Sequence, residues 1–263
     1  MKYTLITGAS SGIGLCFAKQ LAAKGENIII VSNQQERNEE VATSLKQRFG
    51  VEAVALYADL SKGDSAEHIY EWCKERNYEI STLISNAGIL QFGLFLNTKP
   101  EMADFITGLH CITTSKLCRL FGEDMCQRGE GRIVIISSMT AWTPYITISY
   151  YAATKAYLKS FAQSLWYEFR PYGVTVTTVY PGAVDTPLYS LDVKQRKWLR
   201  AFGVMMSADK LAKAGIRALE RGRRTAIPGL FTKVAVGACW LLPAHALLPI
   251  LKIPVIKRIL AKL

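Results

Sequence analysis

The sequence predicts an α/β protein with a doubly wound parallel sheet of about seven strands and helices on both faces. Three observations indicate this class. Apolar runs of strand length alternate with amphipathic stretches of helix length. The strand candidates at 27–31 and 132–136 are almost entirely apolar, which is typical of parallel strands covered on both faces. A glycine-rich turn follows the first strand and opens the first helix. This alternation implies right-handed crossovers.

The expected elements follow the hydrophobic pattern from one end of the chain to the other. Strands are expected over 3–7, 27–32, 52–57, 82–85, 132–138, 174–180 and 225–227. Helices are expected over 12–24, 37–49, 62–76, 101–128, 149–172 and 207–221. The helix over 149–172 has the clearest i, i+3, i+4, i+7 pattern. Its expected buried stripe comprises Leu158, Phe161, Ala162, Leu165, Trp166 and Phe169. We expect one domain over 1–228 and an apolar, basic extension over 229–263.

The composition of the 263 residues, 50% hydrophobic and 20% charged, supports a sizeable core and excludes disordered and collagen-like classes. The six cysteines form no C-x-x-C pair, which favours free thiols in a reducing compartment over a disulfide scaffold. The three histidines lie far apart in the sequence, so no metal site is predicted. The N-terminus reads as a short strand and not as a secretory segment, so a cytoplasmic location is expected.

The net charge of +11 is concentrated in the last part of the chain. Residues 1–189 carry 17 Lys and Arg against 18 Asp and Glu, whereas residues 190–263 carry 15 against 3. A basic segment on a neutral body indicates an anionic partner, either a membrane surface or a substrate with a phosphate group. The alternative is a solvated basic face that keeps the protein soluble. Neither zinc-finger spacing nor an RNP-type aromatic run is present, so no nucleic-acid partner is predicted.

The first motif is the turn over residues 7–14, Thr-Gly-Ala-Ser-Ser-Gly-Ile-Gly, between a strand and a helix. Glycines allow the backbone to turn tightly and approach a pyrophosphate, and the helix N-terminus offers free N–H groups to the phosphates. The spacing is G-x-x-x-G-x-G, and a purely structural glycine turn is the alternative. Residues 8–12 also match the G-x-S-x-G pattern of a serine hydrolase, with Asp185 and His245 as triad candidates. That interpretation is weakened because the motif lies on the first strand.

The second motif pairs Tyr151 with Lys155 at i, i+4 spacing, which places a phenol and an ammonium on one face of a helix. A nearby cation lowers the pKa of a phenol, so Tyr151 is expected to exchange protons near neutral pH. Ser138 is the last residue of the strand candidate at 132–138 and is a hydrogen-bond donor for a substrate carbonyl. The alternative for the pair is a surface contact.

Three further turns follow predicted strands: Asp59-Leu60, Asn86-Ala87-Gly88, and Pro181-Gly182-Ala183-Val184-Asp185-Thr186. Each alone is consistent with an ordinary turn. Open α/β sheets bind ligands at the carboxyl ends of their strands, which is where all of these motifs are expected.

Taken in order, the motifs resemble the short-chain dehydrogenase/reductase family over about residues 3–228. The resemblance implies a Rossmann-like fold, with a nicotinamide dinucleotide across the carboxyl edge of the sheet. It implies Tyr151 as the acid/base, Ser138 as the carbonyl-orienting hydroxyl and Lys155 as the residue that holds the ribose and lowers the pKa of Tyr151. The implied cofactor-binding residues are Gly8, Ser10, Ser11, Gly12, Ile13, Gly14, Asn33, Asp59, Leu60, Asn86, Ala87, Gly88, Tyr151, Lys155, Pro181, Gly182, Val184 and Thr186. We also expect a homo-oligomer, either a dimer or a tetramer.

The sequence departs from this family at two places. His110 stands where many members have an asparagine that helps a proton-relay water, and it either replaces that residue or is a packed helix residue. The segment after the second strand, 31–37, has no acid at its first positions to bind a ribose 2′-hydroxyl. Ser10, Ser11, Ser32 and Asn33 are possible donors to a 2′-phosphate, and Arg37 is near in sequence. We therefore expect NADP(H) to be favoured over NAD(H).

The extension contains 18 positions, 234–251, without a charged side chain. A helix of that length spans about 27 Å against about 30 Å of hydrocarbon, and Pro243 and Pro249 interrupt it. An interfacial hairpin or an apolar lid is expected instead of a membrane span. Residues 252–263 mix cations with large aliphatic side chains, so peripheral membrane contact through 234–263 is predicted. A subunit contact or a core-capping helix is the alternative.

The substrate loop, about 187–206, is rich in apolar residues and methionines, which suits a lipophilic ligand. The extension resembles those of a family branch whose suspected substrates are lipid-like ketones such as 3-oxoacyl chains. The leading hypothesis is an NADP(H)-dependent oxidoreductase that interconverts a lipophilic ketone and a secondary alcohol. The alternatives are a membrane-attached dinucleotide-binding protein without turnover, and the serine hydrolase.

Overall fold

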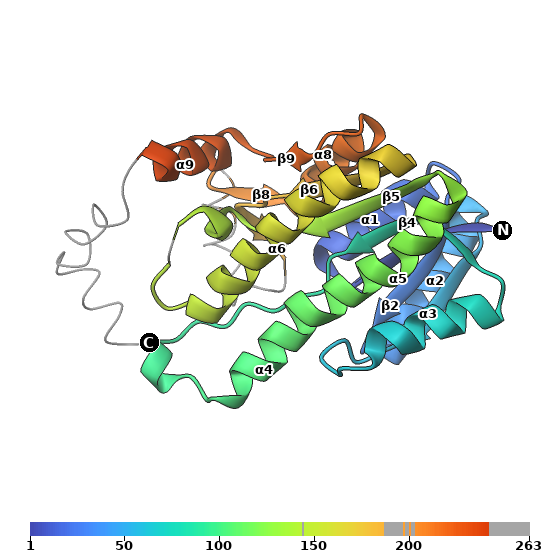
Figure 1. Cartoon of the computed structure of the whole chain (residues 1–263), viewed down its shortest axis with the longest axis horizontal. Helices are drawn as coiled ribbons and strands as arrows, with labels where there is room; N and C mark the ends of the chain where they lie inside the picture. Colours follow the sequence, from blue (N-terminus) through green and yellow to red (C-terminus); the bar gives the residue numbers. More distant parts are fainter. Residues whose placement is uncertain (144, 187–196, 198–199, 201–202, 242–263) are drawn as a thin grey trace.

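The computed structural model describes residues 1–143, 145–186, 197, 200 and 203–241. Its centre is a seven-stranded parallel sheet with the order β3-β2-β1-β4-β5-β6-β9 (Figure 1). The strands are β1 (Lys2–Thr7), β2 (Asn27–Ser32), β3 (Ala53–Tyr57), β4 (Glu79–Ser85), β5 (Gly131–Ile136), β6 (Val174–Val179) and β9 (Thr225–Ala226). The predicted fold class is confirmed, and each of the seven expected strands is present within three residues of its predicted bounds.

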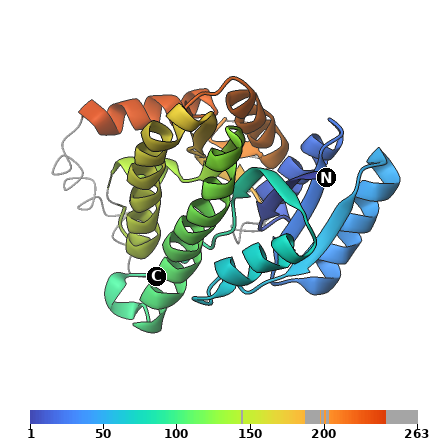
Figure 2. The ribbon, with the colours of Figure 1, turned by 45° about the vertical axis from the view of Figure 1, so that its right-hand side comes forward.

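Helices cover both faces of the sheet (Figure 1 and Figure 2). They are α1 (Gly12–Ala22), α2 (Gln35–Phe49), α3 (Ser65–Glu75), α4 (Glu101–Thr107), α5 (Thr113–Arg128), α6 (Ser149–Phe169), α8 (Ala208–Glu220) and α9 (Leu230–Leu241). The helix predicted over 101–128 is present between these bounds, but a π-helical turn at Gly108–Ile112, which the sequence did not predict, joins its two parts, α4 and α5. Short 3-10 helices lie at Phe95–Asn97, Met139–Trp142 and Arg170–Tyr172.

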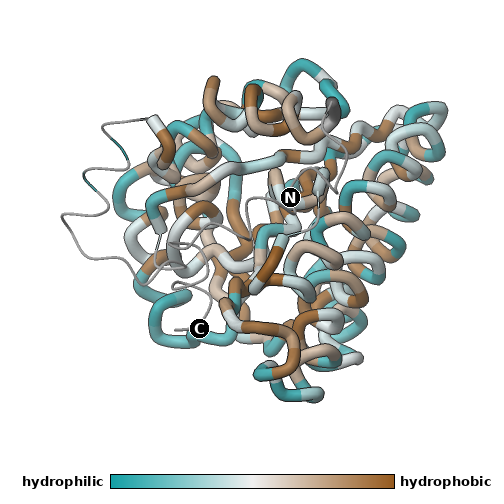
Figure 3. Tube along the Cα trace, turned by 90° about the vertical axis from the view of Figure 1, so that its left-hand side faces the viewer, coloured by the Kyte–Doolittle hydropathy of each residue, from teal (hydrophilic) through white to brown (hydrophobic). Residues whose placement is uncertain are grey.

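Strand β2 shows why the apolar runs do not alternate. Its residues Ile28 to Val31 are all fully buried. Ile28 and Ile30 belong to the core on the face covered by α1, α2 and α8, whereas Ile29 and Val31 belong to the core under α3, α5 and α6. Because successive side chains point to opposite faces, a strand buried on both faces must be apolar throughout. The helices outside the sheet, in contrast, contain both hydrophilic and hydrophobic residues (Figure 3).

The order of the strands creates a switch point. The chain builds outward from β1 through β2 to β3, then returns to the other side of β1 with β4. Crevices form at the carboxyl ends of strands where the order reverses in this way. The carboxyl ends of β1 and β4 are therefore the expected position of a ligand site.

A second sheet, which the sequence did not predict, pairs β7 (Ala183–Asp185) with β8 (Met205–Ser207) in parallel. Each strand has only three residues. Such short strands carry no readable period, and only pairing between distant segments defines them.

Helix α9 is the described part of the predicted extension and lies on the side of the molecule away from the N-terminus (Figure 1). Thr232 and Val236 are buried, whereas Leu230, Phe231 and Val234 are exposed. No helix within the described residues combines the length and hydropathy needed to cross a bilayer. Most of the substrate loop and residues 242–263 lie outside the described residues, and the boundary at 228 stays a prediction.

Candidate functional site

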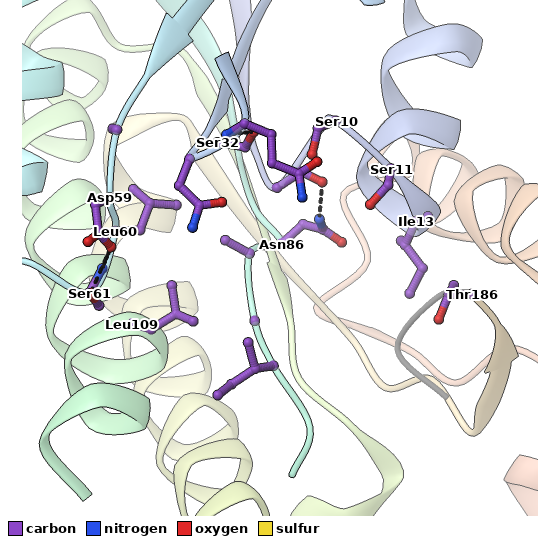
Figure 4. Close-up of a pocket in the computed structure, with 18 of the residues that line it drawn as sticks. Ser10, Ser11, Ile13, Ser32, Asp59, Leu60, Ser61, Asn86, Leu109 and Thr186 are labelled. Carbon is purple, nitrogen blue, oxygen red and sulfur yellow. Dashed lines mark hydrogen bonds between the residues drawn. The ribbon is translucent and has the colours of Figure 1, made fainter. Parts of the chain in front are cut away.

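A pocket lies at the switch point, and it gathers most of the predicted cofactor residues (Figure 4). The predicted residues that line it are Gly8, Ser10, Ser11, Gly12, Ile13, Asn33, Asp59, Leu60, Asn86, Ala87, Gly88 and Thr186. They come from the carboxyl ends of β1, β2, β3 and β4 and from the segment after β7. Further lining residues that the sequence did not single out include Ala58, Ser61, Ile89, Phe105 and Leu109.

The turn after β1 needs glycine for conformation and for space. Gly8 and Gly12 have φ angles of 67° and 55°, which side-chain-bearing residues rarely adopt. A Cβ on Gly8 would lie 2.9 Å from the Ala87 Cα. Within the described residues, the side chain of Ser11 does not cap α1, and the first turn of that helix contains no acid. The backbone N–H groups at this helix start are therefore available to an anion, so the turn fits a dinucleotide pyrophosphate.

Thr7 and Asn86 fasten the ends of β1 and β4 to each other. The Thr7 hydroxyl accepts hydrogen bonds from the backbone N–H groups of Asn86 at 2.9 Å and Ala87 at 3.1 Å. The Asn86 side-chain amide donates to the Thr7 carbonyl oxygen at 3.0 Å. It also donates to the Gly8 carbonyl oxygen at 3.2 Å (Figure 4). Asn86 thus positions the glycine turn as well as lining the pocket. The structural role of Thr7 was not predicted.

Asp59 lines the far side of the pocket and stays ionised. Hydrogen bonds from the Ser61 hydroxyl at 2.7 Å and the Ser61 backbone N–H at 3.1 Å hold its pKa below the ordinary value. It is the only acid among the described residues that line this pocket.

Lys155 is fixed at the carboxyl end of β5. Its Nζ donates to the Ile136 carbonyl oxygen at 2.9 Å, and the Ser137 hydroxyl donates to the Lys155 carbonyl oxygen at 2.8 Å. The Nζ lies 5.5 Å from the centre of the Tyr151 ring. Burial lowers the pKa of the Lys155 ammonium to about 8. The amine is therefore held in a desolvated position one helical turn from Tyr151.

Ser138 follows the same strand end, because β5 ends at Ile136 and not at 138 as predicted. The Ser138 side chain is buried, and its oxygen accepts the Thr140 backbone N–H at 3.1 Å. A hydroxyl that accepts one bond still carries a proton to donate. Ser138, Tyr151 and Lys155 thus all belong to the segment between the end of β5 and the first two turns of α6.

Several predicted cofactor residues do not line the pocket: Gly14, Tyr151, Lys155, Pro181, Gly182 and Val184. Gly14 lies behind the turn, where a Cβ would come within 2.3 Å of the Gly8 carbonyl oxygen. Its role is close packing between helix and turn. Gly182 packs against α9, since a Cβ there would lie 2.4 Å from the Thr232 hydroxyl oxygen. Val184 is buried in the core under α1 and α8.

Arg37 lies beside the glycine turn. Its Nε donates to the Ser10 carbonyl oxygen at 3.4 Å, and its Nη1 pairs with Glu40 at 2.6 Å. Ser32, Asn33 and Gln34, at the end of β2, line the neighbouring wall of the pocket. Asn33 and Gln34 present side-chain amides on this wall near the Arg37 guanidinium, whereas the buried Ser32 hydroxyl donates to the Asn38 Oδ1 at 2.6 Å.

His110 is fully buried in the π-helical turn between α4 and α5. Its Nε2 accepts the Ile89 backbone N–H at 3.0 Å, and its Nδ1 lies 2.8 Å from the Thr154 hydroxyl. The ring meets Tyr151 edge-on at 5.8 Å between centroids. The participation of Thr154 was not predicted, although the residue stands inside the Tyr151–Lys155 motif.

Comparison with known proteins agrees with this geometry. A family model described as short chain dehydrogenase matches residues 2–197. Human 17-beta-hydroxysteroid dehydrogenase type 3 is 32% identical over 250 residues, which cover 93% of this chain and 76% of that protein. Rat very-long-chain 3-oxoacyl-CoA reductase is 31% identical over 193 residues, which cover 71% of this chain and 61% of that protein.

Solved structures give the same result. A short-chain dehydrogenase from Sphingobium yanoikuyae in complex with NADPH has a TM-score of 0.81 and 30% identity, with 90% of this chain and 92% of that chain covered. A bulky-bulky ketone specific alcohol dehydrogenase from Comamonas testosteroni has a TM-score of 0.77 and 27% identity, with coverage of 92% and 93%. The chain therefore belongs to the short-chain dehydrogenase family and is an oxidoreductase that interconverts CH–OH and C=O groups.

Proposed function

We propose that this protein reduces a lipophilic ketone to a secondary alcohol with NADPH. The observation that carries the proposal is the placement of Lys155, buried and bonded to the end of β5, one helical turn from Tyr151. A buried amine is expensive to maintain and is not needed to fold α6, so its retention here points to chemistry.

When bound, the nicotinamide cofactor supplies the hydride for the carbonyl carbon. The residues that would hold its phosphates belong to the turn from Gly8 to Ile13, and Asp59 and Asn86 would flank its adenine and its central part. Tyr151 donates a proton to the carbonyl oxygen, and the Ser138 hydroxyl orients that oxygen with a hydrogen bond. The Lys155 ammonium favours the phenolate that Tyr151 becomes.

Support for a lipophilic substrate comes from the relatives. The small cavity beside Tyr151 is lined by the apolar side chains of Phe95, Met102, Ile106 and Ile148 together with polar ones, and it is too small to hold such a substrate by itself. Two relatives named above carry names that refer to a hydroxysteroid and to a very-long-chain 3-oxoacyl-CoA. A steroid skeleton and a very long acyl chain are both large apolar groups, and each of these molecules also has a hydroxyl or carbonyl group, which is the substrate class we propose.

The first test screens steroid ketones and 3-oxoacyl thioesters with NADPH, read as loss of the nicotinamide absorbance. Tyr151→Phe should lower kcat by about 10²-fold or more, because the general acid is lost while the ring remains. NADPH binding, measured by fluorescence, should change little. Tyr157→Phe, an exposed tyrosine on the same helix, is the matched control and should retain activity. A Tyr151→Phe protein with wild-type kcat would remove Tyr151 from the reaction.

Arg37 and the side-chain amides of Asn33 and Gln34 support NADP(H) over NAD(H). We expect Arg37→Ala to raise the KM for NADPH about tenfold, because a charged hydrogen bond to the 2′-phosphate is lost, and to leave the KM for NADH unchanged. Asn33→Asp should shift preference toward NADH. Arg48→Ala, at the other end of α2, is the control. Equal losses with both cofactors would contradict the NADP(H) assignment.

We also propose that the basic C-terminal part makes peripheral contact with a membrane. The support is the exposed apolar face of α9, formed by Leu230, Phe231 and Val234, together with the cation-rich sequence at 252–263. The cytoplasmic location and the oligomeric state stay predictions.

The two alternative functions are less favoured. Family membership argues against the serine hydrolase, and His245 of its proposed triad lies outside the described residues. Asp185 of that triad pairs with Arg200 at 3.2 Å. The dinucleotide-binding protein without turnover is disfavoured because Ser138, which follows β5, and Tyr151 and Lys155, on the first two turns of α6, supply the three groups that the proposed reaction needs.

A further inference from the structure

We infer that His110 is a neutral positioning residue that joins the turn after β4 to the helical turn carrying Tyr151. The inference rests on the proposed function, because it assigns His110 a role in placing the acid of that reaction. The sequence offered two roles for His110, a proton-relay residue and a packed helix residue. The positioning role is a third.

The hydrogen bonds around the ring determine which nitrogen carries the proton. The Ile89 backbone N–H donates to Nε2, so Nε2 must be the unprotonated nitrogen. The Thr154 hydroxyl donates to the Tyr151 carbonyl oxygen at 2.9 Å, so it accepts from Nδ1–H. These three hydrogen bonds form one series, and donation runs in the same direction throughout: from Ile89 to His110, from His110 to Thr154, and from Thr154 to Tyr151.

This series of hydrogen bonds cannot conduct protons into or out of the site. One end is a peptide N–H and the other is a peptide carbonyl, and neither titrates in the range where proteins are folded. Burial, reinforced by the Lys155 cation, lowers the pKa of His110 well below its ordinary value, which is consistent with a neutral ring. The bonds therefore hold geometry and do not carry charge.

The two ends of this series of hydrogen bonds lie in the two segments whose relative position matters for the proposed reaction. Ile89 follows Gly88 and lines the cofactor pocket, whereas the carbonyl of Tyr151 belongs to the residue that donates the proton. Gly88 must lack a side chain here, because a Cβ would lie 2.8 Å from His110 Nε2. The π-helical turn places the imidazole between these segments by adding one residue to the helical turn.

The experiment compares four substitutions that remove the hydrogen bonds of His110 selectively. His110→Phe keeps the ring volume and removes both bonds. His110→Asn retains a polar group near Nδ1, and His110→Gln retains one near Nε2. Thr154→Val keeps His110 and removes the link to Tyr151. All rates are normalised to NADPH-binding sites, so that only folded protein is counted.

We expect kcat to fall about 10- to 100-fold in His110→Phe and Thr154→Val, with little change in NADPH affinity. The Asn and Gln variants should recover part of the loss. The His110→Phe/Thr154→Val double variant should be no slower than the worse single variant, since both break the same chain. His68→Phe, an exposed histidine on α3, is the control and should keep wild-type kcat.

A second readout does not depend on turnover. In ¹⁵N-histidine-labelled protein, the His110 nitrogens should show the Nδ1–H tautomer, and Thr154→Val should shift the Nδ1 signal. Wild-type kcat in Thr154→Val, or an Nε2–H tautomer, would overturn the inference. If the wild-type protein reduces no ketone but shows the Nδ1–H tautomer and the shift, the proposed function fails and the hydrogen-bonded chain stands.

Discussion

Lys155 is a residue whose position opposes folding. The side chain is buried and the pKa is lowered to about 8, so the folded protein binds this proton more weakly than the unfolded chain does, where the ordinary value is 10.5. Between these two values the unfolded chain holds more protons, and stability rises with pH. Below about pH 8 the full cost of burying the charge is present.

Lys155→Met should therefore stabilise the cofactor-free protein while it abolishes reduction. The gain in free energy of unfolding is expected to reach about 3 kcal/mol below pH 8, less the lost bond to Ile136, and to decline as the pH rises toward 10.5. Urea unfolding at pH 7, 8, 9 and 10 measures it. A difference between variant and wild type that is independent of pH would show that the Lys155 proton does not cause the effect.

At this scale the sequence allowed part of the site to be predicted. The Tyr151–Lys155 pair is readable because both residues stand four positions apart in one helix. The His110 contacts are not, because Ile89 and Thr154 lie 21 and 44 positions away along the chain. Only the packing of α4, α5 and α6 around the π-helical turn brings them together. Arg37 was anticipated near the ribose, but its bond to Ser10 required the crossing of α2 over the turn.

At the scale of elements, the packing of α8 on α1 depends on a missing side chain. Gly215 faces the Phe17 ring, and a Cβ would lie 2.6 Å from the Phe17 Cζ and 3.4 Å from the Val179 Cγ2. Phe17 and Val179 are fully buried, so neither can move aside easily. The glycine allows the helix to approach β6 closely.

Gly215→Ala should destabilise the protein by about 1–3 kcal/mol, because the added methyl group overpacks the core. Gly237→Ala is the matched comparison: Gly237 is also a glycine inside a helix, but no described residue has an atom within 4 Å of the added Cβ. That substitution should be neutral or stabilising by up to about 1 kcal/mol, since alanine favours helix. Chemical denaturation measures both. Equal effects of the two substitutions would contradict the packing argument.

Helices and strands could be predicted from the sequence where the hydrophobic pattern extends over many residues. The stripe on α6 is confirmed, with Leu158, Ala162 and Leu165 buried and the aromatic members packed around them. The π-helical turn inside the helix over 101–128 was not predicted, because the sequence at 108–112 does not distinguish a π turn from an α turn. The extra residue of a π-helical turn is decided by contacts such as those of His110 and not by local preference.

For the whole molecule, the charge is separated between a neutral body and a basic C-terminal part. Described cations of that part include Arg221, Arg223, Arg224 and Lys233, close in sequence to the exposed apolar face of α9. Cations near an anionic leaflet contribute about 1 kcal/mol each, and apolar side chains add burial in the interface.

The protein should therefore co-sediment with vesicles that contain phosphatidylserine and much less with vesicles of phosphatidylcholine alone. Binding should weaken as salt is raised, because the charge contribution is screened. Replacing Leu230, Phe231 and Val234 together with serine should reduce binding at every salt concentration. Equal sedimentation with both kinds of vesicle, or with neither at low salt, would argue against membrane contact.

The mutual fastening of β5 and α6 has an evolutionary consequence. The groups proposed to carry the reaction are held on the sheet by the hydrogen bonds of Ser137 and Lys155, whereas the predicted substrate loop, about 187–206, comes after Thr186. Mutations in that loop can accumulate without disturbing these hydrogen bonds. Such a division allows the same reaction to be carried out on substrates of very different size.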